Sequence, residues 1–426
     1  MTFRDIWRAA LIGALLLGAL AALALGALTW SVGHADHDAI RRALAAAEPQ
    51  ELGVPLLKRP VRGFEAGYFP DCAGLAILTR EDRWPDPAIA AVRADTILPD
   101  GIEEMCRRLQ VELTGGDDGK WFTYARYWHG ALLLHRAVLS GGSYADLQRA
   151  AAAVVGLALV VLLAGAAWRV GAAPGLLLVL SLALLTDART VIDLPVQAVG
   201  FAAMLMAVAG FAAFGAGRTG IWALVAAALS GAALNFFDFL YTPAAFAMLN
   251  AWVWLAAVRT DGKPRSWFDA ALIFGASLGG YAAFWALKWA IAFGFDPSGQ
   301  QIFIFGANEF TRWGPATGAT WPLKASGLAV AATFDMWWKG ATALVLIAAA
   351  LVLRRMRGGA GWPRVLLLLV PVLPALLVIE VMAAHTINHL GFTFRIVPAV
   401  LAILAASLAL RYTAPEARKA AISAAE

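Results

Sequence analysis

The chain is built around long apolar stretches, and ten of them approach or reach the length that crosses a lipid bilayer. A transmembrane helix needs about 20 consecutive, mostly apolar residues. The candidate segments are residues 7–30, 147–168, 173–185, 194–214, 220–237, 240–258, 267–293, 340–353, 365–384 and 392–410. The sequence therefore predicts an all-α integral membrane protein with about ten transmembrane helices.

The overall composition supports this prediction. Apolar residues make up 61% of the 426 residues and charged residues 15%, whereas soluble domains average about 45–50% apolar and about 25% charged residues. So large an apolar fraction cannot be hidden inside a water-soluble core, which excludes a soluble enzyme, a disordered chain and a small disulfide scaffold. The net charge of +5 indicates no nucleic-acid partner, because membrane proteins collect Lys and Arg on one side of the bilayer. Membrane lipids are the expected partners.

The basic residues predict the orientation. If the N-terminus is cytoplasmic, the inside segments hold fourteen Lys and Arg residues, which are Arg4, Arg8, Arg169, Arg218, Arg259, Lys263, Arg265, Arg354, Arg355, Arg357, Arg364, Arg411, Arg418 and Lys419. The short outside loops hold Arg189, Arg312 and Lys324. Such an excess marks the cytoplasmic side, so we expect both termini inside. The first apolar run, of about 22 residues, exceeds a signal-peptide core of about 7–15 and is interpreted as an uncleaved anchor.

Two hydrophilic insertions interrupt this single polytopic domain of residues 1–426, and both are expected outside. They cover residues 33–146 and 295–339. Cys72 and Cys106, the two cysteines of the chain, lie in the first insertion. An oxidising compartment favours a disulfide between them, and two buried free thiols are the alternative.

The first insertion also contains two helical patterns. Residues 38–48 predict an amphipathic helix. Residues 122–139 predict a second helix at the membrane surface, on which Arg126, His129 and Arg136 share one face.

Ionisable side chains gather at the outer ends of the predicted spans. Among them are Asp238, Lys288, His385, His389 and Arg395. Charged groups in a bilayer are costly and indicate a functional site by default, although a single one at a helix end can extend to water. Because these come from separate helices and share one face, we expect a polar cavity that opens outward.

These residue types suit glycosyl transfer from a lipid-linked donor. A carboxylate can accept the proton of an acceptor hydroxyl, Arg and Lys can hold a departing polyprenyl phosphate, and Tyr and Trp can stack on sugars or line a lipid groove. His385 and His389 have the i, i+4 spacing of metal ligands, but the sequence specifies no third ligand. No cofactor is therefore predicted, and a divalent metal at these histidines is an alternative to hydrogen bonds with phosphate or hydroxyls.

Four short stretches resemble a group of bacterial multi-spanning membrane proteins whose organisation is similar to the GT-C superfamily of glycosyltransferases. They are residues 124–130, 235–243, 280–289 and 385–395. GT-C enzymes have a long first external loop that usually carries a catalytic Asp or Glu, and they use polyprenyl-phosphate sugars as donors. The resemblance implies an inverting transferase in the bacterial cytoplasmic membrane, with its active face outside.

Three carboxylates are candidates for the catalytic base. The GT-C pattern places the acidic residue soon after the first helix, which here indicates Asp36 or Asp38. We favour Asp71 because Pro70 and Cys72 constrain its backbone and an apolar segment follows it. Asp36 and Asp38 lie in a charge-rich stretch that suits a helix N-terminus, and they remain the alternatives.

The remaining expected site residues bind phosphate or shape the substrate pocket. The phosphate-binding group consists of Arg126, Lys288 and Arg395, assisted by His129, His385 and His389. The pocket group consists of Tyr127, Trp128, Asp238 and Tyr241.

The sequence thus predicts a membrane glycosyltransferase that moves a sugar from a polyprenyl-phosphate donor to a cell-envelope glycan or lipid acceptor. A polysaccharide polymerase or ligase would use the same kind of outward site, and the sequence does not separate these activities. A polyprenyl-linked sugar flippase is a further alternative, but it predicts polar residues through the depth of the bilayer, and the inner halves of the spans nearly lack them.

Overall fold

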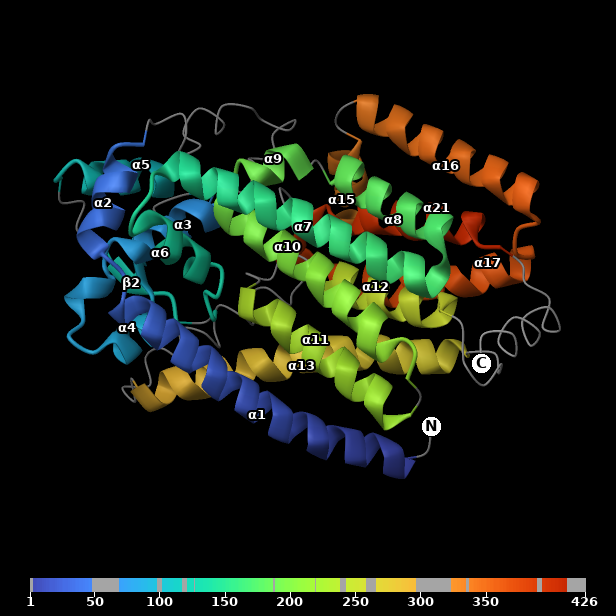
Figure 1. The fold of residues 1–426 in the computed structure, drawn as a ribbon, viewed down its shortest axis with the longest axis horizontal. Coiled ribbons are helices and arrows are strands. Elements are labelled where there is room, and N and C mark those ends of the chain that lie inside the picture. The colour runs from blue at the N-terminus through green and yellow to red at the C-terminus, as the bar shows by residue number, and fades with distance from the viewer. Residues whose placement is uncertain are drawn as a thin grey trace.

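The computed structural model of the chain consists of helices and one two-stranded sheet in the residues that it describes. These are residues 3–47, 69–97, 102–116, 121–125, 127–186, 188–218, 220–237, 243–257, 266–295, 323–334, 337–388 and 393–411. The long helices run along the longest axis of the molecule (Figure 1).

Six helical segments in the described residues are long and apolar enough to cross a bilayer. They are α1 (Phe3–Gly33), α7 (Tyr144–Val170), α10 (Pro195–Gly210) with its π-helical continuation η3 (Phe211–Gly215), α13 (Trp267–Phe295), α16 (Trp337–Arg357), and α17 (Trp362–Leu369) joined to α18 (Val372–Val381). Each coincides with a predicted span. A multi-pass membrane protein is the architecture that such a set of apolar helices indicates.

Four shorter apolar helices coincide with the other predicted segments. They are α8 (Ala172–Leu185), α11 (Ile221–Phe237), α12 (Pro243–Ala256) and α21 (Ile396–Ala409). A helix of 14 residues, such as α12, is about 21 Å long, shorter than the hydrocarbon core of about 30 Å. Almost every residue of α12 is buried against other helices, so protein rather than lipid surrounds it. The total of about ten spans stays a prediction.

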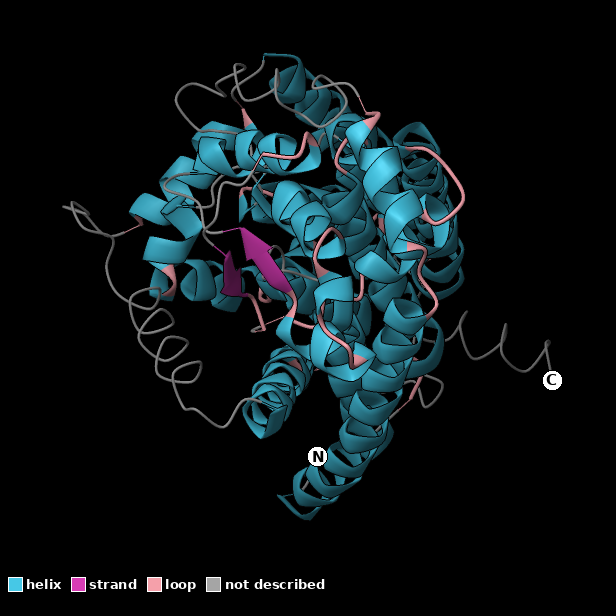
Figure 2. Ribbon diagram, turned by 90° about the vertical axis from the view of Figure 1, so that its left-hand side faces the viewer, coloured by secondary structure: helices cyan, strands magenta, loops and turns pink. Residues whose placement is uncertain are grey.

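The first insertion folds into a small unit at one end of the helices, which we call the cap. Its elements are α2 (His37–Ala45), α3 (Phe69–Leu78), the 3-10 turn η2 (Glu81–Arg83), α4 (Pro87–Arg93), β1 (Asp95–Ile97), α5 (Ile102–Leu113), β2 (Trp121–Thr123) and α6 (Leu132–Leu139). β1 and β2 pair antiparallel, and Figure 2 shows this small sheet surrounded by helices, with the cap facing the viewer. The amphipathic helix predicted over 38–48 is confirmed as α2, which buries Ile40 and Leu44.

The helix predicted over residues 122–139 is wrong in its first half. Trp121–Thr123 is a strand, and α6 begins only at Leu132. His129 has a φ of 59°, and the Gly130 N–H donates to the Phe236 carbonyl at 2.8 Å. A Cβ at Gly130 would lie 2.5 Å from that carbonyl oxygen. This contact with α11 overrides the helical pattern, because it requires a left-handed residue followed by glycine.

Exposed tryptophans lie at both ends of the long helices. Trp30 lies near the cap end of α1 and Trp337 at the start of α16, whereas Trp7, Trp168, Trp222, Trp267 and Trp362 lie at helix ends away from the cap. Trp7 and Trp30 are about 35 Å apart along α1 at 1.5 Å per residue. Tryptophans favour the two interfaces of a bilayer, and this spacing fits a hydrocarbon core of about 30 Å.

The basic residues of the short connections lie at the helix ends away from the cap. Those described are Arg4, Arg8, Arg169, Arg218, Arg354, Arg355, Arg357, Arg364 and Arg411. Two of them bind backbone carbonyls there: Arg169 donates to the Ala212 oxygen at 2.7 Å, and Arg364 donates to the Leu255 oxygen at 2.5 Å.

Candidate functional site

Asp71 lies where the cap meets the bundle, against the N-terminus of α10. Its Oδ1 accepts a hydrogen bond from the Val196 backbone N–H at 2.7 Å, and only 3% of its surface is exposed. Leu194, the residue before α10, supplies no side-chain cap. Asp71 therefore caps this helix from another element, at the end where the helix dipole attracts negative charge.

The environment of Asp71 shifts its acidity to the neutral range. Burial raises the pKa of Asp71 to about 7, because the carboxylate has lost contact with water, while hydrogen bonds from Val196 and Gln197 and the charge of Arg395 oppose the rise. The second oxygen, Oδ2, is buried without a hydrogen-bond partner among the described residues. Asp71 thus has the acidity of a general base that works near pH 7.

Gln197 joins Asp71 to a buried cation. Its side chain hydrogen-bonds to Asp71, and its Oε1 accepts from Arg395 Nη2 at 2.9 Å. Gln197 and Arg395 are 1% and 4% exposed, and Arg395 directly precedes α21. We call Asp71, Gln197 and Arg395 the carboxylate–arginine cluster. The sequence predicted Asp71 and Arg395 as site residues but not Gln197. The only sequence feature that could have indicated Gln197 is that it is a polar amide near the start of the apolar segment 194–214.

A narrow cavity of about 30 Å³ lies between α12, α18, α19 (Ala383–Asn388) and the start of α21, where its lining residue Ile396 directly follows Arg395 in the chain. His385, Thr386 and Thr393 provide its polar lining, and Thr393 Oγ1 donates to the Thr386 carbonyl at 2.9 Å. Thr393 lies two residues before Arg395, which places predicted His385 near the cluster. A cavity of this size holds water-sized groups, so a sugar would enter only if its walls moved.

Lys339 provides a second buried cation on this side of the bundle. It is 4% exposed, and its Nζ lies 5.4 Å from the centre of the Phe394 ring and 5.7 Å from that of Trp338. Phe394 is the neighbour of Arg395 in the chain. Aromatic faces stabilise a cation that has lost water. Lys339 and Arg395 thus place two buried cations around Phe394.

Tyr127 and His129 of the cap pack together with Tyr124. Tyr127 stacks on Trp285 of α13, with ring centres 5.9 Å apart and planes 7° apart. A nitrogen of His129 lies 2.8 Å from the Tyr124 carbonyl oxygen. The left-handed backbone of His129 is of the kind that collects at functional sites.

Lys288 and Trp128 fasten the cap to the bundle. Lys288 Nζ donates to the Val92 carbonyl at the end of α4 at 2.8 Å, where the helix dipole favours a cation. Trp128 Nε1 donates to the Phe284 carbonyl at 3.0 Å. Lys288 was predicted to bind phosphate; the structure gives its ammonium group a backbone partner.

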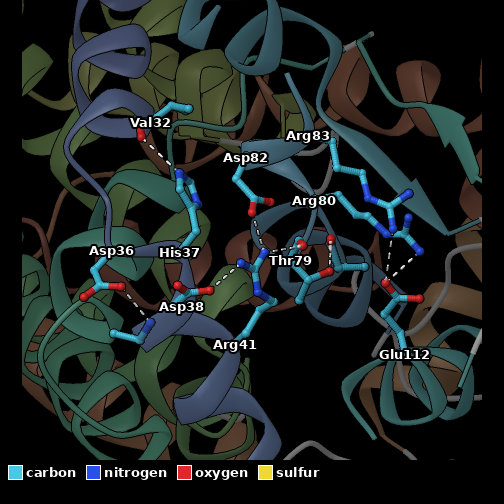
Figure 3. A network of polar contacts seen from close by, with 12 residues as sticks. Val32, Asp36, His37, Asp38, Arg41, Thr79, Arg80, Asp82, Arg83 and Glu112 are labelled. Carbon is cyan, nitrogen blue, oxygen red and sulfur yellow. Dashed lines mark hydrogen bonds and ion pairs between the residues drawn. The ribbon is translucent and has the colours of Figure 1, made fainter. Parts of the chain in front are cut away.

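The two alternative carboxylates have structural partners in the cap. Asp36 Oδ1 accepts from the Ala39 backbone N–H at 2.8 Å and caps α2. Asp38 pairs with Arg41 at 2.7 Å, and Arg41 also reaches Asp82 at 2.8 Å (Figure 3). Its bond to Arg41 lowers the pKa of Asp38 from its usual value. These contacts favour Asp71 over both alternatives.

Some predicted residues lie outside the described part of the chain. These are Arg126, Asp238, Tyr241 and His389. Cys72 is disulfide-bonded. Cys106, the other cysteine of the chain, belongs to α5, but its side chain is not described.

The described residues contain no group of three or more His, Cys, Asp or Glu side chains that could hold a metal ion. His385 is described and His389 is not, so the alternative of a metal at this pair is untested.

Comparisons of the chain with models of protein families, with curated proteins and with solved structures find no match. The function must therefore be inferred from the site itself.

Proposed function

We propose that the protein is a membrane glycosyltransferase that moves a sugar from a polyprenyl-phosphate donor to a cell-envelope glycan or lipid at the cap end. The carboxylate–arginine cluster carries this proposal, because it joins a carboxyl group with a pKa of about 7 to a buried guanidinium at the outer ends of apolar helices.

Each residue of the cluster has a role in this chemistry. Asp71 removes the proton from the acceptor hydroxyl as that oxygen attacks the anomeric carbon of the donor. The bond to the phosphate oxygen breaks, and Arg395 offsets the charge on the departing polyprenyl phosphate. Gln197 holds both side chains in register, and Lys339 adds positive potential. This single displacement inverts the anomeric centre.

The distribution of surface residues supports an extracytoplasmic cap. The basic residues of the short connections between helices lie at the end of the bundle away from the cap. An excess of Lys and Arg in short connections marks the cytoplasmic side, whereas arginines in a long insertion such as the cap carry no such information. Lipid-linked sugars are also the donors that suit a compartment without nucleotide sugars. We therefore place the cap outside the bacterial cytoplasmic membrane.

Replacing Asp71 by Asn is expected to lower the transfer rate at least 100-fold, the order of magnitude that general-base catalysis contributes. The Asn carbonyl oxygen can still accept from Val196, so α10 keeps its cap. The purified protein is reconstituted with a panel of undecaprenyl-phosphate sugars and acceptor glycans. Mass spectrometry then measures released undecaprenyl phosphate, whichever sugar is used.

The wild-type rate should rise with pH through about 7, because only the ionised carboxylate accepts a proton and burial raises the Asp71 pKa to about 7. An Asp36→Asn variant, altered only at the α2 cap, is the matched control and should retain activity. Equal rates in the Asp71→Asn variant and the wild type would remove Asp71 from the mechanism. Failure of the wild type to release lipid phosphate from any donor would overturn the proposed function.

A further inference from the structure

Arginine side chains gather at the end of the bundle away from the cap, where α16, α17 and α21 meet. On α16, Ala343, Leu346 and Ala350 form the buried face that packs against the other helices. Arg354 and Arg357 follow Ala350 by four and seven residues, so they continue this face beyond the apolar part of the helix. The two cations therefore lie at the junction of the helices.

The chain reverses after α16 and brings the next segment back over Arg354. Gly358 has a φ of 65°, and the Gly359 N–H donates to the Arg354 carbonyl at 2.9 Å, as in helices that end with a left-handed glycine. Trp362, the first residue of α17, has its ring centre 4.5 Å from the Arg354 guanidinium carbon. Gly359 also forms a backbone bridge with Arg411, just after α21. The arginine–tryptophan site, as we call it, consists of Arg354, Arg357, Arg411 and Trp362.

The segment that forms this site has almost no negative charge. Between residues 337 and 411 the only acidic residue is Glu380. It lies 18 residues beyond Trp362, about 27 Å away at 1.5 Å per residue, and accepts a hydrogen bond from the Ser326 N–H at 2.6 Å. Arg354 Nη1 is buried without a hydrogen-bond partner among the described residues. The positive charge of the site therefore suits an anionic ligand.

Exposed apolar side chains lie directly beside the cations. Leu351 and Val352 precede Arg354 on α16, and Leu366 follows Trp362 by one helical turn on α17; all three are exposed. Both helices belong to segments that are long and apolar enough to cross a bilayer. A ligand that uses the cations and the apolar faces together has an anionic head and apolar chains, which is the chemistry of an acidic phospholipid.

We infer that the arginine–tryptophan site binds the phosphate-diester headgroup of an anionic phospholipid such as phosphatidylglycerol, whose acyl chains lie along the exposed faces of α16 and α17. Guanidinium groups suit this partner because their planar donors match phosphate oxygens. The inference is independent of the proposed function, because α21 separates Arg411 at this site from Arg395 at the carboxylate–arginine cluster. The bound lipid would join three helix ends of the bundle.

The test is native mass spectrometry of the intact protein in detergent with added phosphatidylglycerol, and with phosphatidylcholine as the neutral lipid. Arg354→Gln and Arg357→Gln each remove one charge from the site. We expect each to weaken phosphatidylglycerol binding about fivefold, the order of attraction that one basic residue contributes at a membrane surface. Arg354→Lys keeps the charge and should retain most of the binding.

Arg355→Gln is the matched control. It removes the same charge one residue away, from a face of α16 that is turned by about 100° from Arg354, and it should leave phosphatidylglycerol binding nearly unchanged. Arg357 is exposed, so its replacement tests the site even if Arg354→Gln does not fold. A size-exclusion profile matching the wild type confirms that each variant is folded.

Three results would overturn the inference. An equal loss in Arg355→Gln and the two site variants would show diffuse surface attraction instead of a site. Equal binding of phosphatidylglycerol and phosphatidylcholine by the wild type would show that the headgroup charge is not recognised. Displacement of bound phosphatidylglycerol by glycerol phosphate would show that the ligand is a soluble phosphate compound and not a lipid.

Discussion

Replacing Arg136 by Met is expected to destabilise the protein by about 3–5 kcal/mol, the cost of leaving a buried charge without its partner. Arg136 and Glu81 are each 2% exposed, and Arg136 Nε donates to Glu81 Oε2 at 2.9 Å. Arg136 also reaches Ser31, near the end of α1, at 3.4 Å. The pair therefore connects α6 and η2 of the cap with the first long helix. Differential scanning fluorimetry in detergent should show an unfolding temperature lower by several degrees.

A double variant distinguishes loss of the pair from loss of packing. Glu81→Leu combined with Arg136→Met removes both charges, and we expect it to recover much of the lost stability, because apolar groups can replace a buried pair. Arg149→Met is the matched control. Arg149 pairs with Asp146 at 2.6 Å, but their side chains are 75% and 44% exposed, and surface pairs contribute about 0–1 kcal/mol. Equal unfolding temperatures for Arg136→Met and Arg149→Met would contradict this account of the cap.

Gly280→Ala is expected to lower stability by several kcal/mol, although alanine is the better helix former. A Cβ at Gly280 would lie 2.0 Å from the Ala228 carbonyl oxygen, so α11 and α13 would have to separate. Gly231 makes the reciprocal approach, with a Cβ position 2.1 Å from the Ser277 oxygen. Close packing of this kind needs small residues at helix crossings. The yield of monodisperse protein and the unfolding temperature measure the effect.

The adjacent residue provides the control. A Cβ at Gly279 meets nothing within 4 Å, so Gly279→Ala should leave stability unchanged or raise it by up to about 1 kcal/mol through the lower chain entropy of alanine. The two variants add the same methyl group one position apart on α13. Similar stability for both would contradict the close crossing of α11 and α13.

The fold could be anticipated from the sequence wherever it depends on local patterns. The length of the apolar stretches predicts the long helices, and the helical spacing of apolar residues such as Ile40 and Leu44 predicts α2, because both patterns depend on neighbouring residues alone. The segment of the cap between β2 and α6 could not be predicted in this way. His129 and Arg136 do not share one helix, because Gly130 binds the carbonyl of Phe236, more than 100 residues later, and α6 begins only after it. Arg136 lies instead in a buried ion pair.

The candidate site also combines residues that local sequence patterns reveal with residues that only distant contacts bring together. Asp71 and Arg395 could be predicted as site residues from the sequence, because a charged side chain beside an apolar segment is energetically costly and therefore stands out. Gln197 carries no charge and lies within an apolar stretch, so its link between Asp71 and Arg395 depends on the meeting of α3, α10 and α21. Lys288 is the opposite case, because its charge made it a candidate phosphate ligand. Its ammonium group instead donates to the Val92 carbonyl at the end of α4, a contact that the sequence does not reveal.

The most direct test of the central claim, that the site faces away from the cytoplasm, is cysteine labelling in spheroplasts. Arg83 is an exposed residue of the cap, and Arg357 lies exposed at the opposite end, on α16. A membrane-impermeant maleimide should label an Arg83→Cys variant in intact spheroplasts and an Arg357→Cys variant only after permeabilisation. The reverse pattern would place the carboxylate–arginine cluster beside the cytosol and contradict the account.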